Sequence, residues 1–252
     1  MAEAARYLYA VARGTEPAQL ADVSGLRGSS VEVIRYRDLD AVVSDVPLAE
    51  FDEDALKENL EQLSWLEEVA RGHHEVVHAV SARAPTAPMR LATIFLDDDA
   101  VRRRLSELYD ALVEVLDRVE RRVEWSVKAV APEPAPTPVT VPEPTSGAEF
   151  LRRRRAQADE REERQDTGAR AAEAIHHALS EVSVASRILA PQDPQLTGIT
   201  GTMILNGAYL VAVDAQEAFA ARLSEVEETH GDLRIESGGP WPPYSFATLE
   251  SA

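Results

Sequence analysis

The 252-residue sequence contains no cysteine, which excludes disulfides, thiolate nucleophiles, iron–sulfur ligation and every cysteine-based zinc site. Basic residues are also scarce, 26 against 44 acidic residues, giving a formal charge of -18 at pH 7. A surface of this sign repels phosphate backbones and anionic lipid headgroups. We therefore expect neither nucleic acid nor a membrane as the main partner.

Long hydrophobic runs are absent as well. The uncharged stretch at residues 195–213 is interrupted by polar residues and by Gly198, Gly201 and Gly207, which favour β structure over a membrane helix. The N-terminus has an early acid, Glu3, and no apolar run of signal-peptide length. The sequence predicts no transmembrane segment and no secretion, which fits a cytoplasmic location.

The residues that are present have an ordinary globular composition. Hydrophobic residues make up 44% and charged residues 28%, so the chain can bury a core. A single core usually divides near this length, and we therefore expect two domains.

The pattern of residues 1–122 predicts an N-terminal domain of mixed α+β structure. Residues 6–12, 31–36 and 40–46 are rich in β-favouring residues and predict three strands. A helix is predicted from Asp52 to about residue 84, because apolar residues recur there at spacings of three and four. These residues are Leu56, Leu60, Leu63, Leu66, Ala70 and Val77.

A further strand and helix complete this domain. Residues 88–96 read as a buried strand, and the three aspartates at 97–99 suit a helix start, where carboxylates cap free N–H groups. Apolar residues from Val101 to Val119 then follow a helical spacing of four and three. A packed helix is the favoured interpretation, and a coiled-coil scaffold is the alternative.

Residues 123–238 predict a second domain. Strand character over 124–131 is followed by six prolines within 132–146, which predict an extended, mobile loop. Ser146 and Glu149 match a capping box and predict the start of a long helix, in which only the second half carries an apolar stripe. Later elements are expected at residues 184–190 (strand), 200–213 (strand), 215–229 (helix) and 233–237 (strand).

The order of these elements is β-α-β-β-α-β, which is the ferredoxin-like arrangement. Asn206-Gly207 leaves a choice between a hairpin turn and one strand with a bulge at Gly207, and we favour the single strand. Residues 238–240 read as a turn, and residues 239–252 as a C-terminal tail. The fold class is therefore α+β with two domains and a tail rich in proline and aromatic residues.

One catalytic motif is present, the H-E-x-x-H of His74, Glu75 and His78 on a predicted helix. In zinc proteases this spacing places two imidazoles on one face and a carboxylate near a metal-bound water. The extended pattern with a third histidine is missing here, and Glu107 is the one distant carboxylate that we consider. A zinc-dependent hydrolase is therefore the alternative function; the favoured interpretation has His74 bordering the packed helix face, with no catalytic, metal or cofactor residues.

Two segments are candidates for binding a protein partner. Four consecutive arginines, 152–155, are offset by acids in the same helix, so any partner of this segment is more plausibly an acidic protein surface than nucleic acid. The tail carries three large rings on a proline-stiffened backbone, and it either docks on its own domain or binds a partner. The candidate partner-binding residues are Arg152, Arg153, Arg154, Trp241, Tyr244 and Phe246.

Taken together, these segments resemble the gas vesicle protein L/F family (GvpL/GvpF). Residues 89–95 are similar to the family's P-x-R-F-G-T-x-F, with Leu91 and Ala92 in place of the usual aromatic residue and glycine, and residues 124–128 match E-W-x-V-K. Other matching stretches are 7–9, 65–67, 74–77, 150–151, 206–211 and 239–246.

The resemblance implies a non-enzymatic accessory protein, a minor component of the gas vesicles that give microbial cells buoyancy. It implies a role in vesicle assembly, in which the protein binds the main hydrophobic shell protein and limits its aggregation. The implied partners are that shell protein and other gas vesicle accessory proteins, the implied location is the gas vesicle and the cytoplasm, and no cofactor is implied. The family fold implied is two α+β domains, the second ferredoxin-like.

Overall fold

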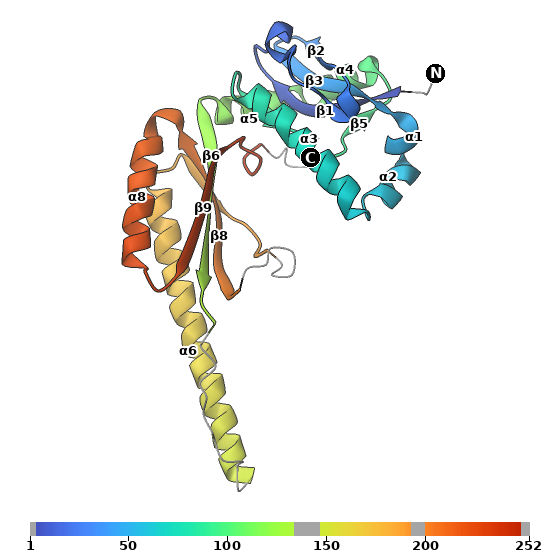
Figure 1. The fold of residues 1–252 in the computed structure, drawn as a ribbon. Helices are drawn as coiled ribbons and strands as arrows, with labels where there is room; N and C mark the ends of the chain where they lie inside the picture. Colours follow the sequence, from blue (N-terminus) through green and yellow to red (C-terminus); the bar gives the residue numbers. More distant parts are fainter. Residues whose placement is uncertain (1–3, 134–146, 193–199, 248–252) are drawn as a thin grey trace. The chain divides into compact units, whose positions relative to one another are not determined.

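The computed structural model describes residues 4–133, 147–192 and 200–247 (Figure 1). The chain divides into two compact units, one of residues 1–124 with 240–252 and one of residues 125–239. Most of the proline-rich segment predicted as a mobile loop lies outside the described residues, as do Ser146 and the Glu149 side chain of the predicted capping box. Within the described ranges, no helix combines the length and the apolarity needed to cross a bilayer.

The first unit is built on a five-stranded sheet whose centre is β1 (Ala4–Ala12). Antiparallel partners lie on both sides of it: β3 (Leu39–Pro47), followed by β2 (Val31–Tyr36), on one side, and β4 (Thr86–Pro88) and β5 (Ile94–Phe95) on the other. The three strands predicted for residues 6–46 are confirmed. Three short helices accompany them: η1 (Pro17–Leu20), η2 (Leu26–Gly28) and α1 (Leu48–Phe51).

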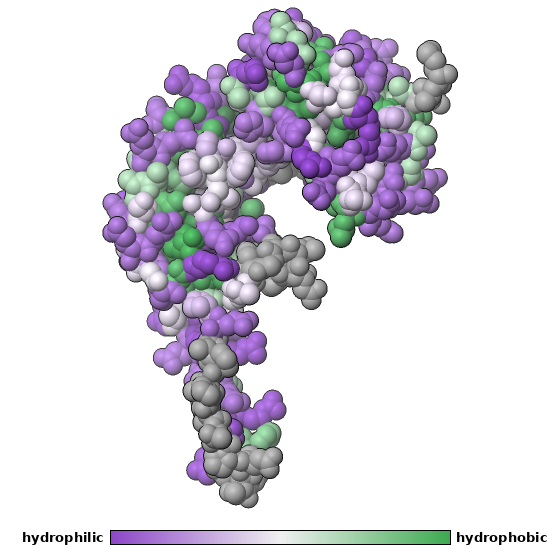
Figure 2. Space-filling view, viewed as in Figure 1, coloured by the Kyte–Doolittle hydropathy of each residue, from purple (hydrophilic) through white to green (hydrophobic). Residues whose placement is uncertain are grey.

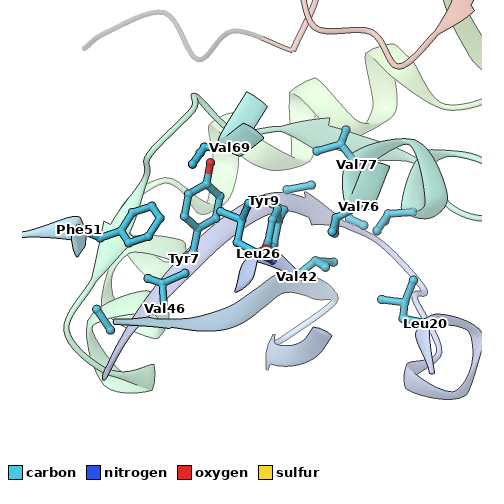
Figure 3. Close-up of a cluster of buried hydrophobic side chains, with 14 of the residues drawn as sticks. Tyr7, Tyr9, Leu20, Leu26, Val42, Val46, Phe51, Val69, Val76 and Val77 are labelled. Carbon is cyan, nitrogen blue, oxygen red and sulfur yellow. The ribbon is translucent and has the colours of Figure 1, made fainter. Parts of the chain in front are cut away.

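Both faces of β1 are buried, which explains its nearly continuous apolar sequence. Tyr7 and Tyr9 point toward α3 (Leu63–Ser81), whereas Leu8 and Val11 belong to the core formed with α4 (Asp98–Glu107) and α5 (Tyr109–Val119). Figure 3 shows the α3 side of this core. The sheet is therefore the middle layer of three, with α3 on one face and the α4–α5 pair on the other.

The single helix predicted from Asp52 to residue 84 is wrong, because two helices occupy this segment. The helix α2 (Glu53–Asn59) ends at Leu60, and α3 begins after Gln62. The predicted apolar stripe also fails: Leu60, Leu63 and Ala70 are exposed. The buried face of α3 is instead formed by Trp65, Val69, His73, Val76, Val77 and Val80.

The strand predicted over residues 88–96 is also interrupted. A turn at residues 91–92 separates β4 from β5, and Ala92 adopts the left-handed conformation with φ 59°. Its N–H donates a hydrogen bond to the Tyr7 hydroxyl at 3.0 Å. The chain therefore loops over Tyr7 instead of running straight along the sheet.

The helix start predicted at the aspartates is confirmed, since the Asp97 carboxylate accepts from the Ala100 N–H at 2.7 Å. The helix itself divides into α4 and α5 at Leu108. Val101, Leu105 and Leu112 are buried in the unit's own core. This burial leaves no apolar stripe for the coiled-coil alternative.

The second unit contains a four-stranded sheet with one face covered by two helices. The strand order is β7-β8-β6-β9, formed by β6 (Arg122–Ala131), β7 (Ala185–Ile188), β8 (Thr202–Ala212) and β9 (Arg234–Trp241). Two helices pack on this sheet, α6 (Gly147–Ser180) and α8 (Gln216–Thr229) (Figure 1). The short helix η3 (Val213–Ala215) precedes α8. The buried contacts with the sheet include Ile175, Leu179 and Phe219.

The structure resolves the choice at Asn206-Gly207 in favour of one strand, β8. Its antiparallel pairing with β7 runs from Leu210 to Gly207 without a register shift and ends at Gly207. A Cβ at Gly207 would lie 2.7 Å from the Tyr209 hydroxyl oxygen, and the glycine therefore makes room for a buried ring two residues along the same face.

The turn predicted at residues 238–240 is wrong, because these residues continue β9 to Trp241. Gly239 has φ 144°, a conformation that other residues rarely adopt. A two-glycine sequence that suggested a turn therefore continues an extended strand.

Candidate partner-binding surfaces

The H-E-x-x-H motif lies on α3, with His74 partly buried and Glu75 and His78 exposed. The His74 and His78 rings are 6.0 Å apart, as the spacing of one helical turn predicts. Glu107 cannot join them, because it forms an ion pair with Arg104 on α4, on the other face of the sheet. Among the described residues, no group of three potential ligands could hold a metal ion, and the zinc-hydrolase alternative gains no support.

Instead, His74 is a docking point for the C-terminal tail. The Tyr244 ring stacks on the His74 ring with centroids 6.1 Å apart and an interplanar angle of 22°, and the Trp241 ring meets His74 edge-on at 6.0 Å. The Tyr244 hydroxyl lies 3.4 Å from His74 Nδ1. Burial and the charge of Glu124 raise the pKa of Tyr244, which keeps its hydroxyl neutral.

A carboxylate fixes the next tail residue. Glu124, 7% exposed, accepts hydrogen bonds from the backbone N–H and the hydroxyl of Ser245, each at 2.7 Å. Phe246 and Ala247 follow with 2% and 3% exposure. Of the three tail rings proposed to contact a partner, Phe246 therefore serves internal packing, Tyr244 is half-buried, and Trp241 remains 42% exposed.

The sequence interpretation did not single out His73, which lies beside the motif. Its ring is 4% exposed, and Nδ1 lies 3.0 Å from the Tyr7 hydroxyl, which also accepts the Ala92 N–H. Burial lowers the pKa of His73 to about 4, so the ring is neutral at pH 7. The burial of His73 could have been predicted from the helical spacing of four residues that joins Val69, His73 and Val77.

The other histidines also have structural roles. His176 Nδ1 lies 3.1 Å from the Tyr209 hydroxyl, and the rings are 5.7 Å apart. His177 is exposed and lies 3.9 Å from Glu181 at the end of α6. Neither arrangement suggests a ligand site.

The predicted division of α6 into a charged half and a packed half is confirmed. Residues 154–167 are exposed throughout, whereas Ile175 and Leu179 are fully buried against the sheet and α8. Figure 1 shows the first half extending beyond the sheet of its own unit. Within this unit, these turns have no packing partner among the described residues.

The predicted arginines occupy the outer end of this extension. Arg152 and Arg154 are exposed and Arg153 is partly buried, directly after Phe150 and Leu151. The two apolar side chains are themselves 48% and 68% exposed, and the Arg154 guanidinium lies 5.9 Å from the centre of the Phe150 ring. The result is an exposed surface that is both apolar and basic on an acidic chain.

Comparisons with known proteins identify the family. Residues 5–248 match the family model described as gas vesicle synthesis protein GvpL/GvpF. The chain is 37% identical to gas vesicle protein L of Streptomyces sp. (strain CB03234), over 97% of this chain and 93% of that protein. It is 26% identical to gas vesicle protein F2 of Halobacterium salinarum, over 99% and 94%.

The fold agrees with this assignment. The crystal structure of the gas vesicle protein GvpF from Anabaena sp. PCC7120 matches with a TM-score of 0.71 over 98% of both chains, at 18% identity. This likeness establishes a shared α+β fold with two antiparallel sheets. The family is one of gas vesicle structural and accessory proteins and is not a known enzyme family. The chain therefore belongs to the GvpL/GvpF family of gas vesicle synthesis proteins.

Proposed function

We propose that this protein is a gas vesicle accessory protein that acts in vesicle assembly, in the cytoplasm, by binding the main hydrophobic shell protein and limiting its aggregation. Family membership supports a gas vesicle role and association with other gas vesicle proteins. The observation that carries the binding proposal is the first half of α6, which has no packing partner among the described residues of its unit and leaves Phe150 and Leu151 exposed.

Apolar surface on a strongly charged chain suits this task physically. Exposed apolar side chains bind the hydrophobic surface of a client, whereas the formal charge of -18 makes the resulting complexes repel one another. The repulsion slows the encounters through which a hydrophobic protein aggregates. No chemical step is needed, which fits a family without known enzymes.

The proposed contact residues are those of the α6 extension together with the exposed part of the tail. Arg152, Arg153 and Arg154 directly follow the apolar pair, and Trp241 adds a half-exposed indole on the other unit. Tyr244 and Phe246 contribute indirectly, because their packing fixes the segment from which Trp241 projects.

We also propose a two-domain layout for the chain, an N-terminal domain of residues 1–122 and a ferredoxin-like domain of 123–238, followed by the tail 239–252. The element order β6-α6-β7-β8-α8-β9 and the strand order β7-β8-β6-β9 support the ferredoxin-like assignment. Residues 240–247 pack with the first unit, which suggests that the tail is a strap on the N-terminal domain.

The test is dilution of the main shell protein from denaturant into buffer with and without the purified chain, followed by light scattering and size-exclusion chromatography. Suppressed scattering with a co-eluting complex supports the proposal. Full scattering and no complex would contradict it. A variant with Phe150→Ser and Leu151→Ser should lose most of the suppression, and Arg161→Ala with Arg164→Ala, in the same helix, is the matched control.

A further inference from the structure

A second exposed apolar surface lies in the first unit, at the turn between α2 and α3. Leu60 is 44% exposed and Leu63 is 78% exposed, and only Glu61 and Gln62 separate them. Figure 2 shows hydrophobic atoms protruding at this turn among hydrophilic neighbours. We call residues 60–63 the leucine turn. Protruding leucines that stay this exposed among charged neighbours are a feature of surfaces that bind a protein.

The charge around the leucine turn is strongly negative. Residues 52–68 contain seven acidic residues and one basic residue, Lys57, which is already paired with Glu53 at 2.9 Å. Glu58, Glu61 and Glu67 form no ion pair within the part of the chain that the structure describes. A partner for this surface therefore needs an apolar centre and several positive charges around it.

The outer end of α6 has both properties. Phe150 and Leu151 are exposed, the four residues that follow are arginines, and no acidic residue occurs from 150 to 158. Among the described residues, these arginines make no ion pair, and only Arg154 is engaged, with the Phe150 ring. We call residues 150–155 the arginine tip. It combines apolar side chains with charge opposite to that of the leucine turn.

We propose that the arginine tip of one copy of this protein docks on the leucine turn of a second copy. Phe150 and Leu151 then cover Leu60 and Leu63, and the arginines meet the free glutamates around the turn. Because each copy carries a formal charge of -18, most orientations of two copies repel each other. The tip is the longest run of positive charge in the sequence, which makes this orientation the electrostatically favoured one.

Geometry permits the contact. The first half of α6, residues 147–167, is about 30 Å long at 1.5 Å per residue, so its outer end lies well beyond the sheet of its own unit and can reach a second molecule. The contact joins two different surfaces, so a pair still has one tip and one turn free. Such head-to-tail contacts extend into chains unless they close into a ring.

Self-association also fits the proposed function without resting on it. The arginine tip is the surface that we assign to the shell protein, and a second copy would cover its apolar residues while no shell protein is present. Added shell protein would then dissociate the assembly by competition. The experiment below uses the purified chain alone, so its failure would not affect the shell-binding proposal.

The test is sedimentation velocity of the full chain over about two decades of concentration, at low and at high salt. Two variants each remove one surface: Leu60→Ser with Leu63→Ser, and Phe150→Ser with Leu151→Ser. Leu96→Ser is the matched control, since Leu96 is 71% exposed and lies outside both surfaces. Circular dichroism confirms that each variant is folded.

The wild type and the control should sediment as species whose mass rises with concentration and falls at high salt. Each variant alone should be monomeric, and an equimolar mixture of the two should form a one-to-one dimer that does not grow, because only one intact tip and one intact turn can pair. A wild type that stays monomeric over the whole range overturns the proposal. Association that both variants retain, or a mixture no heavier than its separate components, overturns it equally.

Discussion

Tyr244 stacks on His74 although the two residues are 170 positions apart in sequence. The contact places the C-terminal tail on α3 at the first histidine of the H-E-x-x-H motif. A pattern associated with metal-dependent hydrolysis in other proteins therefore serves here to fasten a tail. The second histidine, His78, lies one turn further along and contacts the His74 ring.

The tail should contribute strongly to stability. Phe246 is 2% exposed, and replacing a buried phenylalanine by alanine typically costs about 3–5 kcal/mol, because a cavity remains where the ring was. We expect Phe246→Ala to lower the free energy of unfolding by that order, measured by urea unfolding with tryptophan fluorescence. Leu96→Ala, at an exposed position, should change it by less than about 0.5 kcal/mol. Equal effects of the two substitutions would show that the tail is not a packed strap.

The two halves of α6 should respond differently to truncation of a leucine. Leu179 is fully buried in the core of the second unit, and Leu179→Ala should lower the free energy of unfolding by about 2–5 kcal/mol. Leu151 is 68% exposed, and Leu151→Ala should change it by less than about 0.5 kcal/mol. Thermal unfolding followed by circular dichroism measures both. A large loss for Leu151→Ala would mean that the outer half of the helix is packed after all.

Local patterns in the sequence predicted the elements whose buried face follows from the spacing of their own apolar residues. The strands predicted at residues 31–36 and 124–131 and the packed half of α6 with Ile175 follow directly from alternation and helical spacing. The α2–α3 segment was predicted wrongly because Leu60 and Leu63 continue the helical spacing across a break that contains neither proline nor glycine. Their exposure is set by tertiary structure, which selects the face of α3 that carries Trp65 instead.

The candidate surfaces were likewise predictable from the sequence only in part. The unpacked, charged half of α6 was predictable, because a helix without an apolar stripe has nothing to bury. The role of the tail was not, because it depends on Glu124 binding Ser245 over 121 residues. The burial of His73 was predictable from its helical spacing to Val69 and Val77 but was missed, because the neighbouring motif led to a catalytic interpretation first.

A third prediction concerns the turn that follows β4. Ala92 has φ 59°, and the left-handed conformation costs a residue with a Cβ roughly 1–2 kcal/mol, whereas glycine adopts it freely. Part of the gain from Ala92→Gly is offset by the larger conformational entropy of glycine in the unfolded chain. We expect a net stabilisation of up to about 1 kcal/mol in chemical denaturation, in line with the glycine that the family pattern has here. Ala79→Gly within α3 should instead destabilise by about 1 kcal/mol, and a loss of that size at position 92 would contradict the strain argument.

The last prediction is a pH dependence that originates at His73. Burial lowers its pKa from 6.5 to about 4, so between these values the unfolded chain binds a proton that the native ring does not. Stability from this group is therefore fully present above pH 6.5 and is lost as the pH falls toward 4. At about 1.4 kcal/mol per unit of pKa difference, the loss amounts to about 2 kcal/mol at pH 5 and about 3 kcal/mol at pH 4.

A residue that does not titrate isolates this contribution. His73→Gln should be less stable than the wild type at pH 7, because it disturbs the packing against Tyr7, yet it should lose about 2 kcal/mol less than the wild type between pH 7 and pH 5. His177→Gln, the same substitution at an exposed histidine, is the control for the change of side chain. The measurement is urea unfolding at both pH values. Parallel losses in the wild type and His73→Gln would place the acid sensitivity of this protein elsewhere than at the buried histidine.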